Sequence, residues 1–164
     1  VTIMLHENEV DFALAYKLDT FSSSTEVVDL FPDPLCLIVH ERSPLAALKK
    51  ISIQALTHYP LALLKPGSYT RKMIEKIAME SGISLQPMAE INDTNLLLQM
   101  VHTGDWISIL SQHSVDSHPE LRAVPLKEKG GNMQVSLLQL KGRYKKMVAQ
   151  KFIEIIQDTT SHKI

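Results

Sequence analysis

Short apolar runs alternate with amphipathic segments along almost the whole chain, and this alternation is the strongest constraint on its fold. The segments expected to form strands or extended connections are 10–16, 26–31, 35–40, 60–64, 85–91, 106–110, 121–126 and 133–140. The segments expected to form helices are 51–58, 68–82, 92–104 and 142–158. This repeated strand and helix order is typical of an α/β sheet with helices on both faces.

Local signals refine these elements. The run LCLIVH at 35–40 is apolar throughout, as expected of a strand buried on both faces. The segment EVVDLF is expected to be an extended connector that Pro32 and Pro34 stop, and Pro87 confines its strand to an edge or a bulge. The buried helix faces are predicted to be Met73, Ile74, Ile77 and Ala78; Leu96, Leu97, Met100 and Val101; and Met147, Val148, Phe152, Ile155 and Ile156.

Composition narrows the possible functions. The chain of 164 residues carries 17 basic and 18 acidic side chains, a net charge of -1, which argues against a nucleic-acid-binding surface in this segment. No run is long and apolar enough to cross a bilayer, and the acidic N-terminus does not resemble a signal peptide, so a cytoplasmic location without membrane contact is expected. The single cysteine, Cys36, lies in an apolar run and is interpreted as a small buried hydrophobe.

Two predicted junctions between a strand and a helix offer polar groups to a ligand. The first is Lys65-Pro66-Gly67-Ser68-Tyr69-Thr70, with Arg71 as a second nearby cation, and the second is Asn92-Asp93-Thr94. Ligands on open α/β sheets bind beyond the carboxyl ends of strands, where helix N-termini present unpaired N–H groups. The simpler interpretation is that Ser68 and Asp93 only cap their helices, and the residues alone favour it.

Catalytic and metal-binding signatures are missing from the sequence. It contains no G-x-S-x-G elbow, Walker loop, G-x-G-x-x-G or H-E-x-x-H pattern. The histidines His102, His113 and His118 match no metal-ligand spacing, and solvated or capping roles are expected for them. We therefore expect no catalytic residue, metal or cofactor; an enzymatic alternative would need Asp93 or Asp105 as its general base.

The ordered pattern resembles the effector-binding domain of LysR-type transcriptional regulators. The segments that carry the resemblance are ENEVDFALAY, LFPDPLCLIVHERSPLAA, ISIQALTHYPLALLKPGSYTRKMIEKIAMESGI, AEINDTNLLLQMVHTGDWISILS and ELRAVPL. They are similar to the family's L-D-x-A strand, H-P-L-A segment, S-x-x-R strand–helix junction, E-x-N strand end and V-x-x-G-x-G block. The resemblance covers nearly all of the chain from Glu9 onward.

The resemblance implies a two-lobed, Rossmann-like α/β fold similar to type II periplasmic binding proteins. The first lobe would combine residues 1–33 and 120–164, and the second would span 34–119. A small polar or anionic effector would bind between the lobes, at Tyr16, Lys65, Gly67, Ser68, Tyr69, Thr70, Asn92, Asp93 and Thr94. The protein would form homodimers or tetramers and would reach DNA only through a helix-turn-helix domain that this chain lacks.

The sequence also departs from the family pattern. Ser43 stands where the family has His, Gly104-Asp105-Trp106 replaces Gly-x-Gly, and Ser111 replaces Pro. The first strand, helix and strand of the first lobe are also missing, so we expect an N-terminally truncated domain with an incomplete first lobe. The alternatives are a solute-binding protein of a transport system, an enzyme acting at the Lys65–Thr70 loop, and a dimerisation fragment that binds no ligand.

Overall fold

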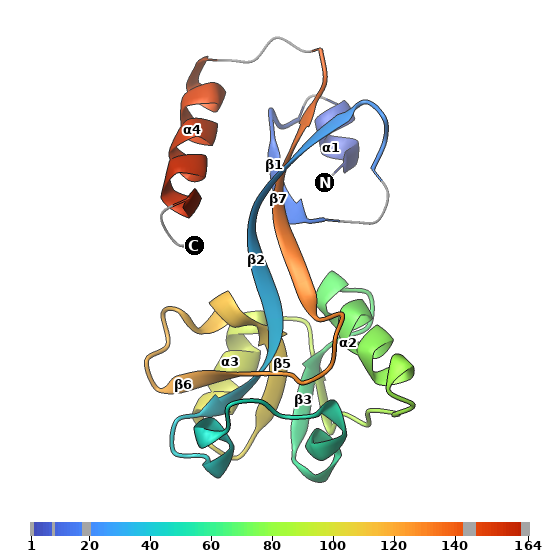
Figure 1. Cartoon of the computed structure of the whole chain (residues 1–164), viewed down its shortest axis with the longest axis vertical. Helices are drawn as coiled ribbons and strands as arrows, with labels where there is room; N and C mark the ends of the chain where they lie inside the picture. Colours follow the sequence, from blue (N-terminus) through green and yellow to red (C-terminus); the bar gives the residue numbers. More distant parts are fainter. Residues whose placement is uncertain (1, 8, 18–20, 143–146, 162–164) are drawn as a thin grey trace. The chain divides into compact units, whose positions relative to one another are not determined.

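The computed structural model describes residues 2–7, 9–17, 21–142 and 147–161, and these residues divide into two compact units. Unit 1 comprises Val1–Pro32 and Met133–Ile164, and unit 2 comprises Asp33–Asn132. Figure 1 shows the strands and helices of both units along the chain. The two-lobed α/β fold expected from the sequence is confirmed.

Unit 1 is a small antiparallel sheet with two helices. Its elements are α1 (Thr2–His6), β1 (Ala13–Tyr16), the first half of β2 (Thr25–His40), β7 (Asn132–Leu140) and α4 (Met147–Ser161). The strand order is β1-β7-β2. The hydroxyl of Ser136 on β7 donates to Asp29 on β2 over 2.8 Å, and Lys17 pairs with the same carboxylate.

Unit 2 is a mixed sheet with α2 and α3 packed against it. Its elements are the second half of β2, η1 (Pro44–Ala47), η2 (Ile53–His58), β3 (Leu61–Leu64), α2 (Tyr69–Glu80), β4 (Ala89–Ile91), α3 (Thr94–His102), β5 (Ile107–Ser111), η3 (Gln112–Val115) and β6 (Leu121–Pro125). The strand order within this unit is β6-β2-β5-β3-β4. The parallel β3, β4 and β5 are joined through α2 and α3, as the alternating sequence pattern predicts.

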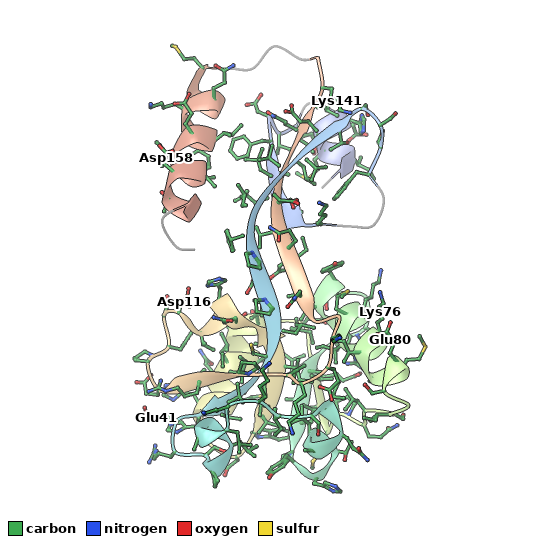
Figure 2. The ribbon with its side chains drawn as sticks, viewed as in Figure 1. Glu41, Lys76, Glu80, Asp116, Lys141 and Asp158 are labelled. Carbon is green, nitrogen blue, oxygen red and sulfur yellow. The ribbon has the colours of Figure 1, made fainter. Side chains whose placement is uncertain are left out.

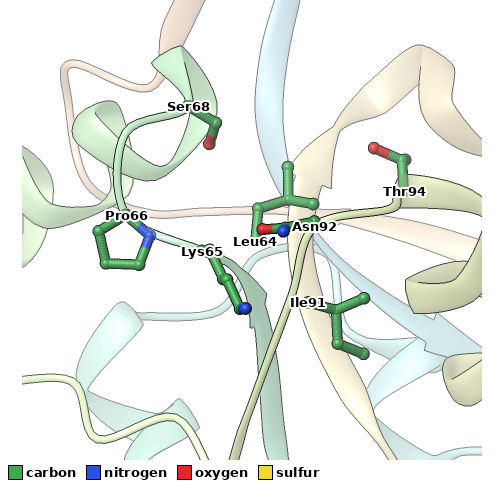
Figure 3. Close-up of a pocket in the computed structure, with 7 residues that line it drawn as sticks. All are labelled: Leu64, Lys65, Pro66, Ser68, Ile91, Asn92 and Thr94. Atoms are coloured by element: carbon green, nitrogen blue, oxygen red, sulfur yellow. The ribbon is translucent and has the colours of Figure 1, made fainter.

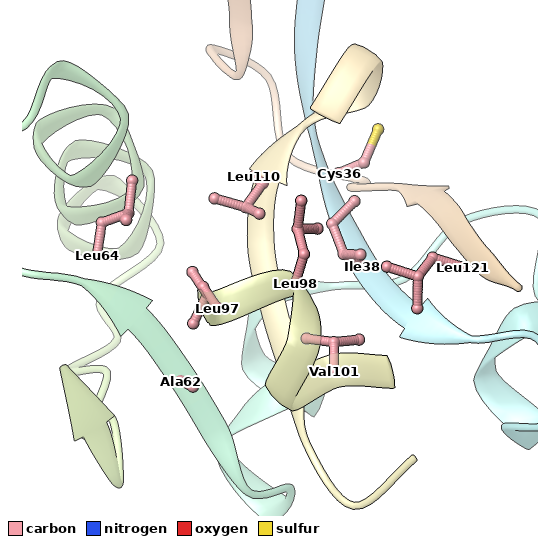
Figure 4. Packing of buried hydrophobic residues seen from close by; sticks show 9 residues of the cluster. All are labelled: Cys36, Ile38, Ala62, Leu64, Leu97, Leu98, Val101, Leu110 and Leu121. Carbon is pink, nitrogen blue, oxygen red and sulfur yellow. The ribbon is translucent and has the colours of Figure 1, made fainter. Parts of the chain in front are cut away.

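The core of unit 2 forms where α3 lies against the sheet (Figure 4). Leu97, Leu98 and Val101 project from α3 onto side chains of β2, β3 and β5 and are 0–3% exposed. The predicted buried face of this helix was wrong at one position, because Leu96 is 49% exposed and Leu98 takes its place. The buried side of α3 (Thr94–His102) therefore carries Leu97, Leu98 and Val101.

The prolines at 32 and 34 do not stop the strand, contrary to the sequence-based expectation. β2 runs without interruption through both residues. A proline cannot donate a ladder hydrogen bond, but its restricted φ suits extended backbone. The pairing of β2 with β5 and β6 begins at Leu35 and Cys36, after both prolines, so the strand changes partners where the prolines lie.

The division into units also differs from the sequence-based boundaries. The first boundary falls after Pro32, one residue from the expected position, but residues 120–132 belong to unit 2 rather than to the first lobe. The reason is strand pairing: β6 pairs along its whole length with β2, from Cys36 to His40. The segment 121–126, which was expected to be a strand or an extended connection, therefore forms a strand of the second unit.

The terminal helix does not bury the face that its periodicity predicts. On α4, Met147 is 80% exposed, Phe152 is 47% exposed and Ile155 is 53% exposed. Phe152 stacks on Phe12, with ring centroids 5.3 Å apart. Residues 143–146 and the side chain of Val148, also predicted to be helical or inward-facing, lie outside what the structure describes.

Lys76 and Glu80 are exposed and project from α2 away from the sheet of unit 2 (Figure 2). Within the described ranges, no helix is both long and apolar enough to cross a membrane.

Candidate functional site

A pocket of about 280 Å³ opens in unit 2 beside the carboxyl ends of β3 and β4 (Figure 3). One wall carries Lys65, Pro66 and Ser68, and the other carries Asn92 and Thr94. The apolar side chains of Leu64 and Ile91, the last residues of the two strands, complete the lining. A volume of this size suits a small molecule rather than a peptide.

The first wall is the loop that leads from β3 into α2. Gly67 has a φ of 107°, a conformation that residues with a Cβ rarely adopt, so glycine is required for the turn. Ser68 is the N-cap of α2, and its hydroxyl accepts a hydrogen bond from the Arg71 N–H over 3.1 Å. The hydroxyl of Ser68 keeps its own hydrogen for donation, so capping and ligand contact are compatible.

The second wall is the turn that leads from β4 into α3. Asp93 is the N-cap of α3, and its carboxylate accepts hydrogen bonds from Asn95 N–H over 2.7 Å and Leu96 N–H over 3.2 Å. These contacts commit Asp93 to the cap, while its neighbours Asn92 and Thr94 line the pocket. Asp93 is thus held as a structural carboxylate, which weakens the enzymatic alternative that needs it as a base.

Parallel pairing brings the two walls together. β3 and β4 are paired from Ala62 with Ala89 to Leu64 with Ile91, so both strands end at the same edge of the sheet. The backbone N–H of Lys65 extends this pairing by donating to the Ile91 carbonyl over 2.9 Å. The N-termini of α2 and α3 therefore begin on either side of one pocket, and each helix contributes the positive end of its dipole.

The two cations predicted at this loop have different environments. The side chain of Arg71 is 9% exposed and is held by Glu75, Glu90 and the Leu64 carbonyl. Lys65 lines the pocket and is exposed, and no carboxylate in the described part of the chain lies within ion-pair distance of its ammonium. Lys65 is thus the cation of the site, and Arg71 belongs to its framework.

The structure brings four of the nine predicted site residues together at the pocket: Lys65, Ser68, Asn92 and Thr94. Gly67, Tyr69, Thr70 and Asp93 lie on the same two turns but do not line it. Tyr16 ends β1 in unit 1, and its role stays a prediction. Pro66 lies within the predicted junction but was not predicted as a contact. Sequence reasoning missed Leu64 and Ile91, although their positions at strand ends beside polar turns were a usable signal.

Two of the three candidate histidines, His102 and His113, are held in contacts with carboxylates. His102 lies 3.3 Å from Glu120, and the pKa of Glu120 is lowered by its own backbone N–H and by His102. His113 pairs with Asp116 over 3.0 Å. Burial raises the pKa of Cys36 to about 11, with a further contribution from Asp33, so its thiol stays protonated at neutral pH. Among the described residues, no three metal-ligating side chains cluster.

Comparison with known proteins identifies the class. The family model described as the LysR substrate binding domain matches residues 1–161. The chain therefore belongs to the family of LysR-type effector-binding domains, as the sequence pattern predicted.

The chain is similar in sequence to two transcriptional activators. It is 35% identical over 83 residues to the transcriptional activator CmpR of Synechocystis, covering 51% of this chain and 27% of CmpR. It is 27% identical over 124 residues to a probable nitrogen assimilation transcriptional activator of Synechococcus elongatus, covering 74% of this chain and 40% of the relative. The chain thus spans about half the length of these relatives.

Solved domains share the fold. The regulatory domain of Synechocystis CcmR, solved with 2-PG, has a TM-score of 0.80 at 22% identity, over 96% of this chain and 77% of that one. The effector-binding domain of BenM, solved with benzoate, has a TM-score of 0.76 at 21% identity, over 99% of this chain and 74% of that one. At these identities the likeness establishes the architecture and leaves the ligand of this chain open.

Proposed function

We propose that the pocket between Lys65–Ser68 and Asn92–Thr94 is the effector site of this domain and takes a small polar or anionic metabolite. The observation that carries the proposal is the meeting of two helix N-termini and one exposed ammonium at the ends of two parallel strands. Oriented N–H groups and the positive ends of helix dipoles favour an anionic group. The hydroxyls of Ser68 and Thr94 and the amide of Asn92 add donors and acceptors.

The proposed role is regulatory and non-catalytic. Ligand binding would favour one of the conformations that the protein already populates, by the difference in affinity between them. The response would pass through a homo-oligomer to DNA, bound by a helix-turn-helix domain outside this chain. The relatives support this role because they are transcriptional regulators. A cytoplasmic location belongs to the same proposal. Gly67, Tyr69, Thr70 and Asp93 would contribute by shaping the two turns that carry the lining residues.

A thermal-shift titration tests the site. The full chain is titrated with 2-PG, benzoate, shikimate and sulfate, since the first three occupy similar domains. A ligand at 100 times its Kd raises the free energy of unfolding by about 2.7 kcal/mol, which is a clear rise in Tm. We expect a saturable rise with at least one of these anions.

The variant Lys65→Met locates the binding, because it keeps the length of the side chain and removes the ammonium. We expect its anion affinity to fall about tenfold, the effect of roughly 1.4 kcal/mol. Lys72→Met is the matched control, since Lys72 is an exposed lysine of α2 that does not line the pocket. Equal affinities for wild type, Lys65→Met and Lys72→Met would reject this pocket as the anion site.

A further inference from the structure

Arg71 occupies an unfavourable position for a cation. It lies in the first turn of α2, three residues after the N-cap Ser68, where the helix dipole disfavours positive charge. It is also 7% exposed, although a buried guanidinium requires partners for its donors. A residue that is disfavoured by both its helix position and its burial needs a compensating set of contacts.

Those contacts join the two walls of the pocket. The Nη1 group of Arg71 donates to the carbonyl of Leu64, at the end of β3, over 2.9 Å. The same Nη1 group donates to Glu90 on β4, immediately before Ile91 and Asn92, over 2.8 Å. The Nε group donates to Glu75, one helical turn further along α2, over 2.8 Å. One guanidinium therefore contacts β3, β4 and α2 at once.

The backbone of Arg71 adds a fourth connection. Its N–H donates to the hydroxyl of Ser68, the capping residue that also lines the pocket. Arg71 thus holds the loop from Leu64 to Ser68 at both ends, and Glu90 ties that loop to the strand that leads into Asn92. We call Arg71, Glu90 and the Leu64 carbonyl the wall clamp.

We propose that Arg71 is the positioning residue of the pocket, fixing the spacing of its two walls through the wall clamp. The inference rests on the proposed function of the pocket as a ligand site. Lysine cannot replace arginine in this role, because an ammonium is a point charge without the planar fork that reaches several acceptors. Holding the donors of a site in place before binding raises affinity by lowering the cost of ordering them.

Two simpler roles make different predictions. If Arg71 acted only as a positive charge, Arg71→Lys would keep the anion affinity, and Glu90→Gln would raise it by removing a negative charge. If Arg71 contributed only to the overall stability of unit 2, its replacement would speed exchange of the Lys65 amide no more than an equally destabilising substitution elsewhere on α2. Ile74→Val provides that comparison, because Ile74 is a 1% exposed residue of the same helix that does not line the pocket.

The test compares the full chain with Arg71→Lys and Ile74→Val in the absence of ligand. Hydrogen exchange of the Lys65 amide reports on the wall spacing, because this N–H continues the pairing of β3 with β4 by donating to the Ile91 carbonyl, and so joins the first wall to the strand that leads into the second. We expect Arg71→Lys to speed this exchange about tenfold, as expected when a charge-assisted hydrogen bond is lost, while Ile74→Val leaves it within about threefold. Equal acceleration in both variants would overturn the positioning role.

A titration with inorganic phosphate, followed by the chemical shifts of the loop amides, completes the test. We expect Arg71→Lys to bind phosphate about tenfold more weakly than wild type although its charge is unchanged. Phosphate affinity equal to wild type, with faster Lys65 exchange, would overturn the link between wall spacing and binding. Failure of wild type to bind any anion would instead count against the proposed effector site, while the exchange data still decide the positioning role.

Discussion

The two units of this chain differ in how they bury their apolar side chains. Unit 2 encloses a cluster from β2, β3, α3, β5 and β6, in which each central residue is less than 10% exposed. In unit 1 the corresponding cluster consists of Leu5, Leu138 and Leu140, with partly buried neighbours around it. Exposed apolar side chains do not distinguish the units, because Ile3 and Met147 in unit 1 are 69% and 80% exposed, while Met79 and Met88 in unit 2 are 75% and 71% exposed.

The difference explains where a precise site is found. The pocket walls in unit 2 begin at strand ends that pack on the core through Leu64 and Ile91. Such anchoring limits the movement of the polar turns that follow, which is what a preorganised site requires. Among the described residues, unit 1 has far fewer fully buried apolar side chains than unit 2, so we expect its elements to open more readily than those of unit 2.

Truncation of one buried leucine in each unit tests this comparison most strongly. Leu97 is 0% exposed and Leu138 is 1% exposed. Leucine to alanine in a core costs about 2–5 kcal/mol, depending on how far the surroundings can relax. We expect Leu97→Ala to lie near the upper end of this range and Leu138→Ala near the lower end, because the small cluster of unit 1 relaxes more easily. Urea unfolding of each variant measures both values.

Leu96→Ala is the control for this experiment. Leu96 precedes Leu97 on α3 but is 49% exposed, so its truncation is expected to change the free energy of unfolding by less than about 0.5 kcal/mol. A loss for Leu138→Ala as large as that for Leu97→Ala would remove the distinction between the two cores.

Removal of the ring of Phe152 is expected to have a smaller effect, centred on α4. Phe152 stacks on Phe12 with an interplanar angle of 29°, and such ring pairs contribute about 0.5–1.5 kcal/mol beyond their buried area. We expect Phe152→Ala to lower the stability of unit 1 by about 1 kcal/mol and to speed hydrogen exchange along α4. The amides of α2 and α3 should keep their wild-type exchange rates.

Ile155→Ala separates the ring contact from general loss of apolar surface. Ile155 lies on the same helix and is 53% exposed, close to the 47% of Phe152. If Ile155→Ala accelerates exchange in α4 as much as Phe152→Ala does, the stacked pair is not what holds this helix.

The fold was predictable where one signal dominated. Ser68 and Asp93 both cap the helices that follow, and Gly82 takes a positive φ just after α2 ends. The order of strands and helices in unit 2 follows from alternating apolar and amphipathic segments. In these places local propensity and tertiary packing favour the same structure, so sequence alone is sufficient.

The sequence-based predictions failed where contacts between residues far apart in the sequence determine the structure. Pro32 was interpreted as a stop, but the extended φ of proline suits a strand that changes partners there. Periodicity predicted that Phe152 and Ile155 face inward on α4, but both are about half exposed. A helix face is buried only where the rest of the unit provides apolar side chains to pack against it. At the pocket, Arg71 was predicted as a cation near the ligand, because the sequence did not reveal its partner Glu90, 19 residues away.

The smallest expected effect is a pH dependence in unit 1. Hydrogen bonds from Lys17 and Ser136 lower the pKa of Asp29. A carboxyl whose pKa is lowered by folding stabilises the native state above its unfolded pKa, and this contribution is lost as the pH falls through the folded pKa. Because Asp29 and Lys17 are each about half exposed, the contribution is at most about 1 kcal/mol.

Urea unfolding of wild type and Asp29→Asn between pH 7 and pH 3 measures this contribution. The difference between the two proteins cancels the titration of all other groups, and we expect it to shrink as the pH falls below the ordinary range of an aspartate. Glu41→Gln is the matched variant in unit 2, because Glu41 forms an ion pair with Arg122 at a similar exposure. Its free energy of unfolding is measured over the same pH range. A difference for Asp29→Asn that stays constant with pH would mean that the Lys17–Asp29–Ser136 contact stabilises unit 1 through packing rather than through charge.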